Sequence, residues 1–353
     1  MNSDSTPFID VGKRSLFLIW GPPSLGPRSR VFSRELGIDD LHYVHTKTRR
    51  GLLSAPYRYS LQAVQTLRLL FQKRPQIVFV QSPPSLAVLI VYLYCMLTHS
   101  QYAIDAHSAA FLVPVWTRPR WLHRFLAQKA IVTIVTNDHF QQIIQHWGGA
   151  SFVLRDIPTH FPQAPSIGLG TGFNLVVVNT FSADEPLDQV LQAAGDLEEV
   201  NFYITGNKKN APEKILAGAP DNVHFTGFLP DENYYGLLNS ADAVMCLTTR
   251  DHTMQRGACE ALSLGKPIIT SDWPMLRDYF RKGTVYVTNT NVGISQGVRE
   301  MVENKRLYQD EIKELQEAQR REWLEKAATL TDMVQQALEP AKAGKRASLH
   351  NCS

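Results

Sequence analysis

Short apolar runs alternate with stretches of helical periodicity along most of the chain. Apolar runs of four to seven residues that are separated by helices are typical of parallel strands buried on both faces. In the first half the pattern predicts strands at 15–20, 41–45, 76–81, 102–107 and 131–136, with helices near 28–37, 57–73, 85–98, 120–129 and 138–147. In the second half it predicts strands at 174–179, 201–205, 223–227, 242–248, 266–271 and 284–288.

The two series predict an α/β protein of two doubly wound, Rossmann-like domains that face each other across a cleft. The length of 353 residues agrees with two domains. A stretch rich in Pro and Gly separates the two series. The expected segments are an N-terminal domain at 1–160, a linker at 161–172, a C-terminal domain at 173–305, a C-terminal helix at 306–340 and a flexible tail at 341–353.

The last helix is expected to carry charge on most of its faces. Its apolar positions are few and widely spaced: Leu315, Trp323, Leu330 and Val334. Such a helix buries one narrow stripe, and we expect it to pack back across the junction between the two domains.

The most apolar stretch, 85–97, holds about 13 residues, fewer than the ~20 that span a bilayer. It is therefore predicted to be a buried helix of the first domain. The polar N-terminus lacks the apolar core of a secretion signal. The four cysteines show neither paired spacing nor a CxxC metal motif, which favours a reducing compartment. We expect a cytoplasmic protein.

The net charge of +3 is unevenly divided. Residues 1–150 hold 16 Lys and Arg against 7 Asp and Glu, whereas the remainder holds 20 against 26. Chance together with an acidic C-terminal helix explains this asymmetry. The alternative is that the basic half meets an anionic partner, such as the cytoplasmic face of a membrane or a phosphate-bearing lipid. Nucleic acid is not expected, because no module of interleaved aromatic and basic residues is present.

The candidate functional residues lie in the loops that follow the strands, because open parallel sheets bind ligands beyond the carboxyl ends of their strands. Arg28 and Arg30 open the helix after the first strand and form a candidate phosphate or acceptor site. Asp105 and His107 end the fourth strand with the same parity, and a histidine placed there can act as a base or as a hydrogen-bond donor. The alternatives are surface arginines without a ligand and a histidine whose bonds stay within the fold.

The strand-end loop with the most polar side chains lies at the start of the segment 248–272. This segment reads TTRDHTMQRGACEALSLGKPIITSD and joins a strand to a helix of small residues that contains one carboxylate, Glu260. Cationic and hydrogen-bonding side chains cluster before this helix. They are Thr249, Arg250, Asp251, His252, Thr253, Gln255 and Arg256.

Three ordered segments together resemble the C-terminal half of the family-four glycosyltransferases, which have the two-domain GT-B fold. These are YITGN at 203–207, FTGFLPDENYYGLLNSADA at 225–243 and CEALSLGKPIIT at 259–270. The resemblance covers roughly residues 174–275, and the N-terminal half matches only in architecture and in His107. The family moves a sugar from a nucleotide-sugar donor and needs no bound metal or other cofactor.

The resemblance implies roles for single residues. Glu260 matches the second acid of the E-x₇-E motif, which contacts the ribose of the donor. Phe228 matches the loop that touches the base, and Gly257 the point where the backbone passes close to the diphosphate. His107 matches the histidine near the sugar and the phosphate. The donor site implied by the aligned loops is completed by Gly206, Asn207 and Lys208.

Two departures from the family pattern stand out. His252 occupies the place of the first acid of E-x₇-E, and Thr180 and Glu185 occupy the places of the phosphate-binding Arg and Lys. A carboxylate beside a diphosphate needs a compensating cation. That cation is expected from Arg250 and Arg256, from Lys208 and Lys209, or from Arg28 and Arg30. Ser182-x-x-Glu185 also fits a capping box before a helix, which is the interpretation preferred for these residues.

The sequence therefore favours a glycosyltransferase. Its catalytic candidates are Asp105, His107, Arg256 and Glu260, and its expected acceptor is a glycan or a lipid-linked saccharide held by the basic N-terminal domain. The resemblance implies retention of the anomeric configuration; if the enzyme inverts, Asp105 or His107 is the base. The alternatives are a sugar-nucleotide epimerase and a non-catalytic GT-B subunit that binds a nucleotide or a partner. The base, the sugar, the acceptor and the oligomeric state are not readable from the sequence.

Overall fold

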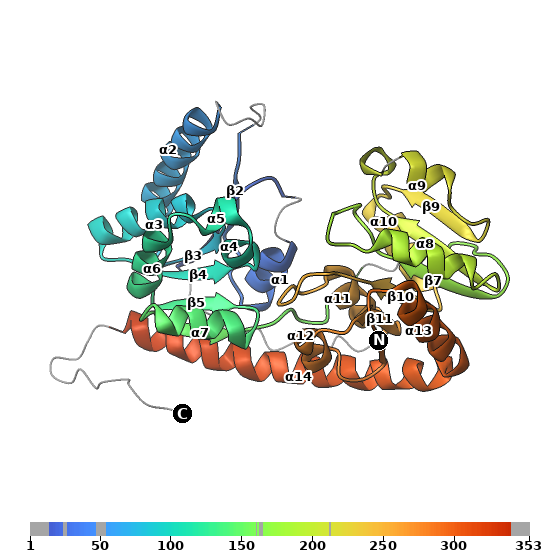
Figure 1. The fold of residues 1–353 in the computed structure, drawn as a ribbon. Coiled ribbons are helices and arrows are strands. Elements are labelled where there is room, and N and C mark those ends of the chain that lie inside the picture. Colours follow the sequence, from blue (N-terminus) through green and yellow to red (C-terminus); the bar gives the residue numbers. More distant parts are fainter. Residues whose placement is uncertain are drawn as a thin grey trace. The chain divides into compact units, whose positions relative to one another are not determined.

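The computed structural model describes residues 14–23, 27–46, 54–159, 161, 165–211 and 213–339. The chain divides into two compact units, one of residues 1–155 together with 324–353, the other of residues 156–323. The predicted tail at 341–353 and part of the predicted linker lie outside the described residues. Each unit contains one six-stranded parallel sheet flanked by helices (Figure 1). The predicted α/β class, the two Rossmann-like sheets and the long C-terminal helix are confirmed.

The sheet of the first unit has the strand order β2-β1-β3-β4-β5-β6. Its inner strands are apolar and buried on both faces, as the continuous apolar runs predict. The elements in chain order are β1 Ser15–Trp20, α1 Pro27–Glu35, β2 Leu41–Val44, α2 Ala55–Lys73, β3 Ile77–Ser82, α3 Ser85–Thr98, β4 Gln101–Ala106, α4 Ala109–Leu112, α5 Pro114–Thr117, α6 Arg120–Lys129, β5 Val132–Val135, α7 Asp138–His146 and β6 Ser151–Val153.

The sheet of the second unit has the order β12-β11-β10-β7-β8-β9. A separate apolar core covers each of its two faces. The elements are β7 Phe173–Val177, α8 Leu187–Gly195, β8 Val200–Thr205, a 3₁₀ turn at Lys208–Asn210, α9 Glu213–Ala217, β9 Val223–Gly227, α10 Asp231–Ser240, β10 Ala243–Cys246, α11 Arg256–Ser263, β11 Ile268–Ser271, α12 Pro274–Tyr279, β12 Thr284–Val287, α13 Asn291–Glu303 and α14 Lys305–Leu338.

Helix α14 begins in the second unit, and its residues from Leu324 onward belong to the first. The four apolar positions that the sequence singles out, Leu315, Trp323, Leu330 and Val334, are all buried. The narrow apolar stripe is therefore the side of the helix that packs, as expected from its spacing.

Several predictions of local structure were incomplete. Strand β4 ends at Ala106 instead of residue 107, so His107 lies in the turn that follows it. The helices α4, α5 and α12 and the strand β6 are too short to show a period in the sequence. Helix α3 is buried only on its inner side, because Leu93, Met96 and Leu97 are exposed. None of the helices in the described residues combines the length and apolar character needed to cross a bilayer.

Both sheets have a switch point, where the chain reverses the direction in which it adds strands. In the first sheet this point lies between β1 and β3, and in the second between β7 and β10. Loops beyond the carboxyl ends of the strands diverge there and leave room for a ligand. Each unit is therefore expected to gather its polar functional residues at the carboxyl ends of the strands beside its switch point.

Candidate active site

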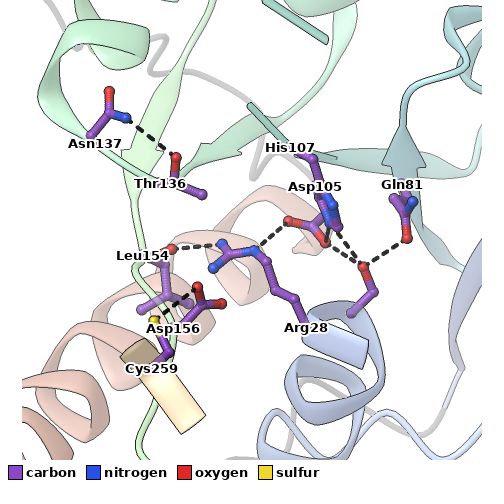
Figure 2. Close-up of polar contacts among 10 residues, drawn as sticks. Arg28, Gln81, Asp105, His107, Thr136, Asn137, Leu154, Asp156 and Cys259 are labelled. Carbon is purple, nitrogen blue, oxygen red and sulfur yellow. Dashed lines mark hydrogen bonds and ion pairs between the residues drawn. The ribbon is translucent and has the colours of Figure 1, made fainter. Parts of the chain in front are cut away.

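The first unit gathers a polar cluster at its switch point (Figure 2). Gln81 on β3 and Asp105 on β4 lie side by side because the two parallel strands pair in that register. Ser29 of α1 donates a hydrogen bond either to Gln81 Oε1, at 3.0 Å, or to Asp105 Oδ2, at 2.7 Å. His107 Nε2 lies 3.1 Å from Asp105 Oδ2 and 3.2 Å from Ser29 Oγ. The cluster therefore fixes the imidazole through Nε2.

Asp105 is completely buried. Its burial raises the pKa of the carboxyl group, but the charges of His107 and Arg28 and the hydrogen bonds from His107 and Ser29 lower it more, to about 2. Asp105 is thus a carboxylate that positions His107. Of the two residues proposed as the base of an inverting enzyme, Asp105 has no exposed surface, whereas the His107 side chain is 22% exposed.

The two arginines of α1 have different surroundings. Arg28 Nε lies 3.6 Å from Asp105 Oδ1, and its guanidinium donates to the Leu154 carbonyl at 2.7 Å and lies 4.1 Å from the centre of the Phe32 ring. Arg30 is exposed and donates to the Tyr43 hydroxyl and the Pro23 carbonyl. Only Arg28 joins the polar cluster, so the predicted pair of phosphate-binding arginines is not formed by the two together.

The second unit gathers its polar groups where β7 and β10 end. Thr249 donates its backbone N–H to the Asp184 carbonyl at 2.7 Å, which ties the two strand-end loops together. The Asp184 carboxylate accepts from Ser182 and from Thr248, and Arg250 NH2 lies 3.3 Å from its Oδ1. Burial raises the pKa of Asp184, but these hydrogen bonds and the charge of Arg250 lower it overall. Arg250 is therefore held at the switch point by a carboxylate that the sequence did not single out.

The Glu185 carboxylate is bonded within its own loop. Its carboxylate accepts hydrogen bonds from the backbone N–H groups of Thr180 and Ser182 and from the Thr180 hydroxyl, all within 2.9 Å. This is half of the capping box that the sequence predicts. The other half is missing, because the Ser182 hydroxyl bonds Asp184 and helix α8 begins later, at Leu187. The negative charge of Glu185 serves to shape the loop.

Helix α11 begins with an ion pair along one of its faces. Arg256 Nε donates to Glu260 Oε1 at 2.7 Å, and the Tyr234 hydroxyl of α10 donates to Glu260 Oε2 at 2.7 Å. Burial lowers the pKa of Arg256, but the charge of Glu260 and its hydrogen bond raise it overall. Burial and the charge of Glu260 raise the pKa of Tyr234, so its hydroxyl keeps its proton and donates. Glu260 is buried, and these two hydrogen bonds orient its carboxylate.

The remaining donor candidates line the same edge of the second sheet. His252 has a left-handed backbone (φ 55°), and its N–H donates to Asp251 Oδ1 at 2.6 Å, while Thr253 bonds the Asp251 carbonyl. Gln255 caps α11 without a side-chain bond of its own to the helix. His252 thus stands in a loop that Asp251 shapes, although the family pattern has an acid in its place.

The loops after β8 and β9 complete the carboxyl edge of the second sheet. Gly206 has φ 114°, and a Cβ there would lie 2.5 Å from the Asn179 carbonyl oxygen, so only glycine fits. Asn207 caps the 3₁₀ turn that carries the exposed Lys208 and Lys209. Phe228, directly after β9, is 80% exposed. An exposed aromatic ring of this kind suits stacking on a base.

Gly257 is small for a reason that the sequence did not reveal. A Cβ on this residue would lie 2.6 Å from Cys246 Sγ and 2.7 Å from Val178 Cβ. The missing side chain therefore lets α11 pack directly against β10 and the end of β7. This close packing places the N-terminus of α11, with its free N–H groups, beside the switch point.

Replacing Gly257 with alanine is expected to lower the free energy of unfolding by about 1–3 kcal/mol, because the added methyl group overpacks this contact. Gly195→Ala is the matched control, since its Cβ would meet only Pro220 Cγ, at 3.7 Å. Urea unfolding of both variants measures the effect. Equal midpoints for Gly257→Ala and the unmodified chain would show that the contact is loose in solution.

The sequence missed four residues of these clusters: Ser29, Gln81, Asp184 and Tyr234. Ser29 stands between the two arginines that the sequence did select, and Asp184 directly precedes Glu185. For these two the neighbouring residues were the signal, but short polar side chains have many structural roles. Among the described residues, no group of three or more His, Cys, Asp and Glu side chains is placed to hold a metal ion.

Comparisons with known proteins agree with this arrangement. Residues 166–320 match the family described as glycosyl transferases group 1. Sucrose-phosphate synthase from Thermosynechococcus elongatus superposes with a TM-score of 0.71 at 12% identity, covering 92% of this chain and 99% of that one. Anabaena HepE in complex with UDP gives 0.67 at 13% identity, with the same coverage. At such identities the structural likeness establishes the fold alone.

A third similar structure is that of a candidate UDP-N-acetylglucosamine 2-epimerase from Listeria monocytogenes. It gives a TM-score of 0.58 at 10% identity, covering 86% of this chain and 91% of that one. No curated protein sequence matches the chain significantly.

Proposed function

We propose that the chain, whose residues 166–320 match the glycosyl transferases group 1 family, is a GT-B glycosyltransferase. It transfers a sugar from a nucleotide-sugar donor to a glycan or a lipid-linked saccharide with retention of configuration. The bond between the anomeric carbon and the donor diphosphate breaks, and a bond to the acceptor oxygen forms on the same face of the sugar. The acceptor proton passes to the leaving phosphate, so the reaction needs no further reactant.

The observation that carries the proposal is the position of the polar groups within the matched domain. Arg250, the Arg256–Glu260 pair and the N-terminus of α11 all lie at the switch point between β7 and β10. This is where doubly wound sheets bind nucleotides. We propose that Glu260 accepts hydrogen bonds from the ribose hydroxyls and that Phe228 stacks on the base. Similar structures in complex with UDP and with UDP-glucose support a nucleotide-sugar donor.

Stabilisation of the departing diphosphate is the main chemical demand on this site. The N–H groups at the start of α11 and the guanidinium groups of Arg250 and Arg256 supply positive charge there. Both arginines have a carboxylate partner in this structure, Asp184 and Glu260. We propose that the donor shares these cations with the carboxylates, which hold the guanidinium groups in place before the donor binds.

In the first unit, His107 is proposed to contact the acceptor or the transferred sugar through its ring, with Asp105 and Ser29 fixing its orientation. A histidine held in this way can donate a hydrogen bond to a ligand or accept a proton from it. We also propose that the protein acts in the cytoplasm and contacts an anionic membrane peripherally. The basic charge of residues 1–150 supports that contact.

A panel of UDP-, GDP- and ADP-sugars tests the proposal. The protein is expected to hydrolyse one donor slowly without an acceptor and to bind its nucleotide in calorimetry. Hydrolysis should disappear in Arg256→Ala. Absence of binding to every nucleotide would instead indicate a non-catalytic subunit.

Arg250→Ala is expected to weaken donor binding by about tenfold, because a charge-assisted hydrogen bond to the diphosphate is lost. Stability should change little, since the Arg250 side chain is 54% exposed. Arg281→Ala is a matched control: Arg281 is 45% exposed and pairs with Glu322 away from the switch point. Calorimetric titration with the nucleotide measures both. Equal affinities for the two variants would remove Arg250 from the donor site.

A sugar-nucleotide epimerase is the second candidate, and the similarity to the Listeria monocytogenes structure favours it. An epimerase rearranges its donor without an acceptor, whereas a transferase consumes it only by transfer or slow hydrolysis. Nuclear magnetic resonance of each UDP-sugar during incubation distinguishes the two. A new sugar nucleotide that accumulates at equilibrium would establish epimerisation.

A further inference from the structure

Helix α3 lies on the surface of the first unit but has no polar side. Its 14 residues, SLAVLIVYLYCMLT, include no charged side chain. One side packs inward, and on the other Leu93, Met96 and Leu97 are 38%, 56% and 69% exposed. A surface helix normally turns charged residues to the solvent, and a helix that is apolar all round is normally covered. The outer side of α3 is therefore the side that needs a partner.

The neighbouring helices extend this apolar surface. Helices α2 and α6 pack against α3 from its two sides. Phe71 of α2 lies 5.2 Å from the ring of Tyr94 on α3, and Phe125 of α6 lies 5.2 Å from the ring of Tyr92. Phe71 is 48% exposed, and Trp121 at the start of α6 is 70% exposed. Most of the exposed large hydrophobic side chains in the described residues lie between residues 57 and 121.

The segment that contains α2, α3 and α6 is strongly basic. Between residues 41 and 137 the sequence contains eleven Lys and Arg and a single carboxylate, Asp105, which is completely buried. Arg68 on α2 and Arg124 on α6 are exposed, and neither forms an ion pair with any other described residue. Lys73 at the end of α2 pairs with Asp40, which lies just before this segment. The apolar surface of α3 is thus flanked by Arg68 and Arg124, whose charges no described carboxylate pairs.

We propose that the outer side of the α2–α3–α6 layer binds the surface of an anionic lipid membrane. This α3 face is defined by Phe71, Met96, Leu97 and Trp121 together with Arg68 and Arg124. Exposed apolar side chains can enter the boundary between headgroups and acyl chains, where tryptophan is favoured, while arginines remain among anionic headgroups. The inference rests on the proposed peripheral membrane contact and adds the surface that makes it.

Two other occupants are less compatible with these observations. A second copy of the chain on this face would bring Arg68 and Arg124 of both copies close together without carboxylates to pair them. An acidic protein would satisfy the charges, but an apolar helix flanked only by cations fits a lipid surface, which supplies headgroup charge and acyl chains together. The test below separates these cases.

Flotation of the full-length protein with vesicles tests the proposal. Binding is expected to vesicles that contain phosphatidylglycerol and not to pure phosphatidylcholine, and to weaken with added salt. Arg68→Glu/Arg124→Glu and, separately, Leu97→Ser/Trp121→Ser should each reduce binding at least about tenfold. Leu307→Ser/Arg306→Glu is the control, because it changes an exposed apolar residue and an exposed arginine of the second unit. Its binding should equal that of the unmodified chain.

Each variant is also titrated with the nucleotide identified by the donor panel. An unchanged urea-unfolding midpoint shows that the first unit of each variant is folded, and unchanged nucleotide affinity separates a failure of the membrane proposal from a failure of the proposed function. Binding to no vesicle, or equal loss in the control, would overturn the proposal. So would a concentration-dependent dimer that Leu97→Ser/Trp121→Ser abolishes while vesicle binding is unaffected.

Discussion

Replacing Glu260 with alanine is expected to reduce sugar transfer about 100-fold. In the proposed site the carboxylate binds ribose hydroxyls, and hydrogen bonds to a charged group contribute roughly 1.5–3 kcal/mol. The substitution also removes the acceptor for both Arg256 and Tyr234, which lie 2.7 Å from its two oxygens. Arg256 would then be free to leave the position in which it meets the diphosphate. Steady-state rates with saturating donor, and donor KM, measure the loss.

Two further variants separate charge from shape at this position. Glu260→Gln keeps the size of the side chain but removes its charge, and it is expected to lose most of the activity. Tyr234→Phe removes a single hydroxyl and leaves the carboxylate, so a loss of only a few-fold is expected. A double-mutant cycle with Arg256→Ala should show strong coupling, because the two side chains act as one unit. Unchanged kcat and KM in Glu260→Ala would exclude Glu260 from the donor site.

Replacing Asp105 with alanine is expected to lower the free energy of unfolding by about 3–5 kcal/mol, the cost of breaking a buried ion pair. Asp105 is completely buried, and the Arg28 side chain beside it is only 11% exposed. Without the carboxylate, Arg28 keeps a charge with little access to water. Ser29 and His107 also lose the oxygen that orients them, so activity should fall with stability. Urea unfolding and transfer assays measure the two effects.

The same residue predicts a dependence on acid. The folded pKa of Asp105, about 2, lies below the ordinary value of 3.8. Its contribution of about 2 kcal/mol is therefore complete above pH 4 and is lost as the pH falls toward 2. In Asp105→Asn this part of the acid dependence should vanish. Asp138→Asn is the control, because that side chain is 70% exposed and lies 3.9 Å from Arg155. Identical acid profiles for Asp105→Asn and the unmodified chain would contradict the assignment.

Much of the fold could be predicted because apolar periodicity reflects burial directly. The strand positions in both halves are close to those observed, and helix α14 spans 305–338, close to the expected 306–340. Segments of three to six residues, such as β6 and α12, carry no period, so their presence depends on the elements around them. The sequence also could not predict that one side of α3 is exposed, because an apolar helix has the same residue pattern whether other elements cover one of its sides or both.

The sequence by itself determined where polar side chains gather: at the ends of parallel strands, with His107, Arg250, Arg256 and Glu260 among the candidates selected. Only the tertiary structure decided what these residues do for one another. The pairing of Arg250 with Asp184 joins residues 66 positions apart, and that of Ser29 with Asp105 joins residues 76 apart. Such contacts follow from strand order and register, which a linear pattern does not contain. The fold likewise decided that Asp105 is buried and that Glu185 shapes its own loop.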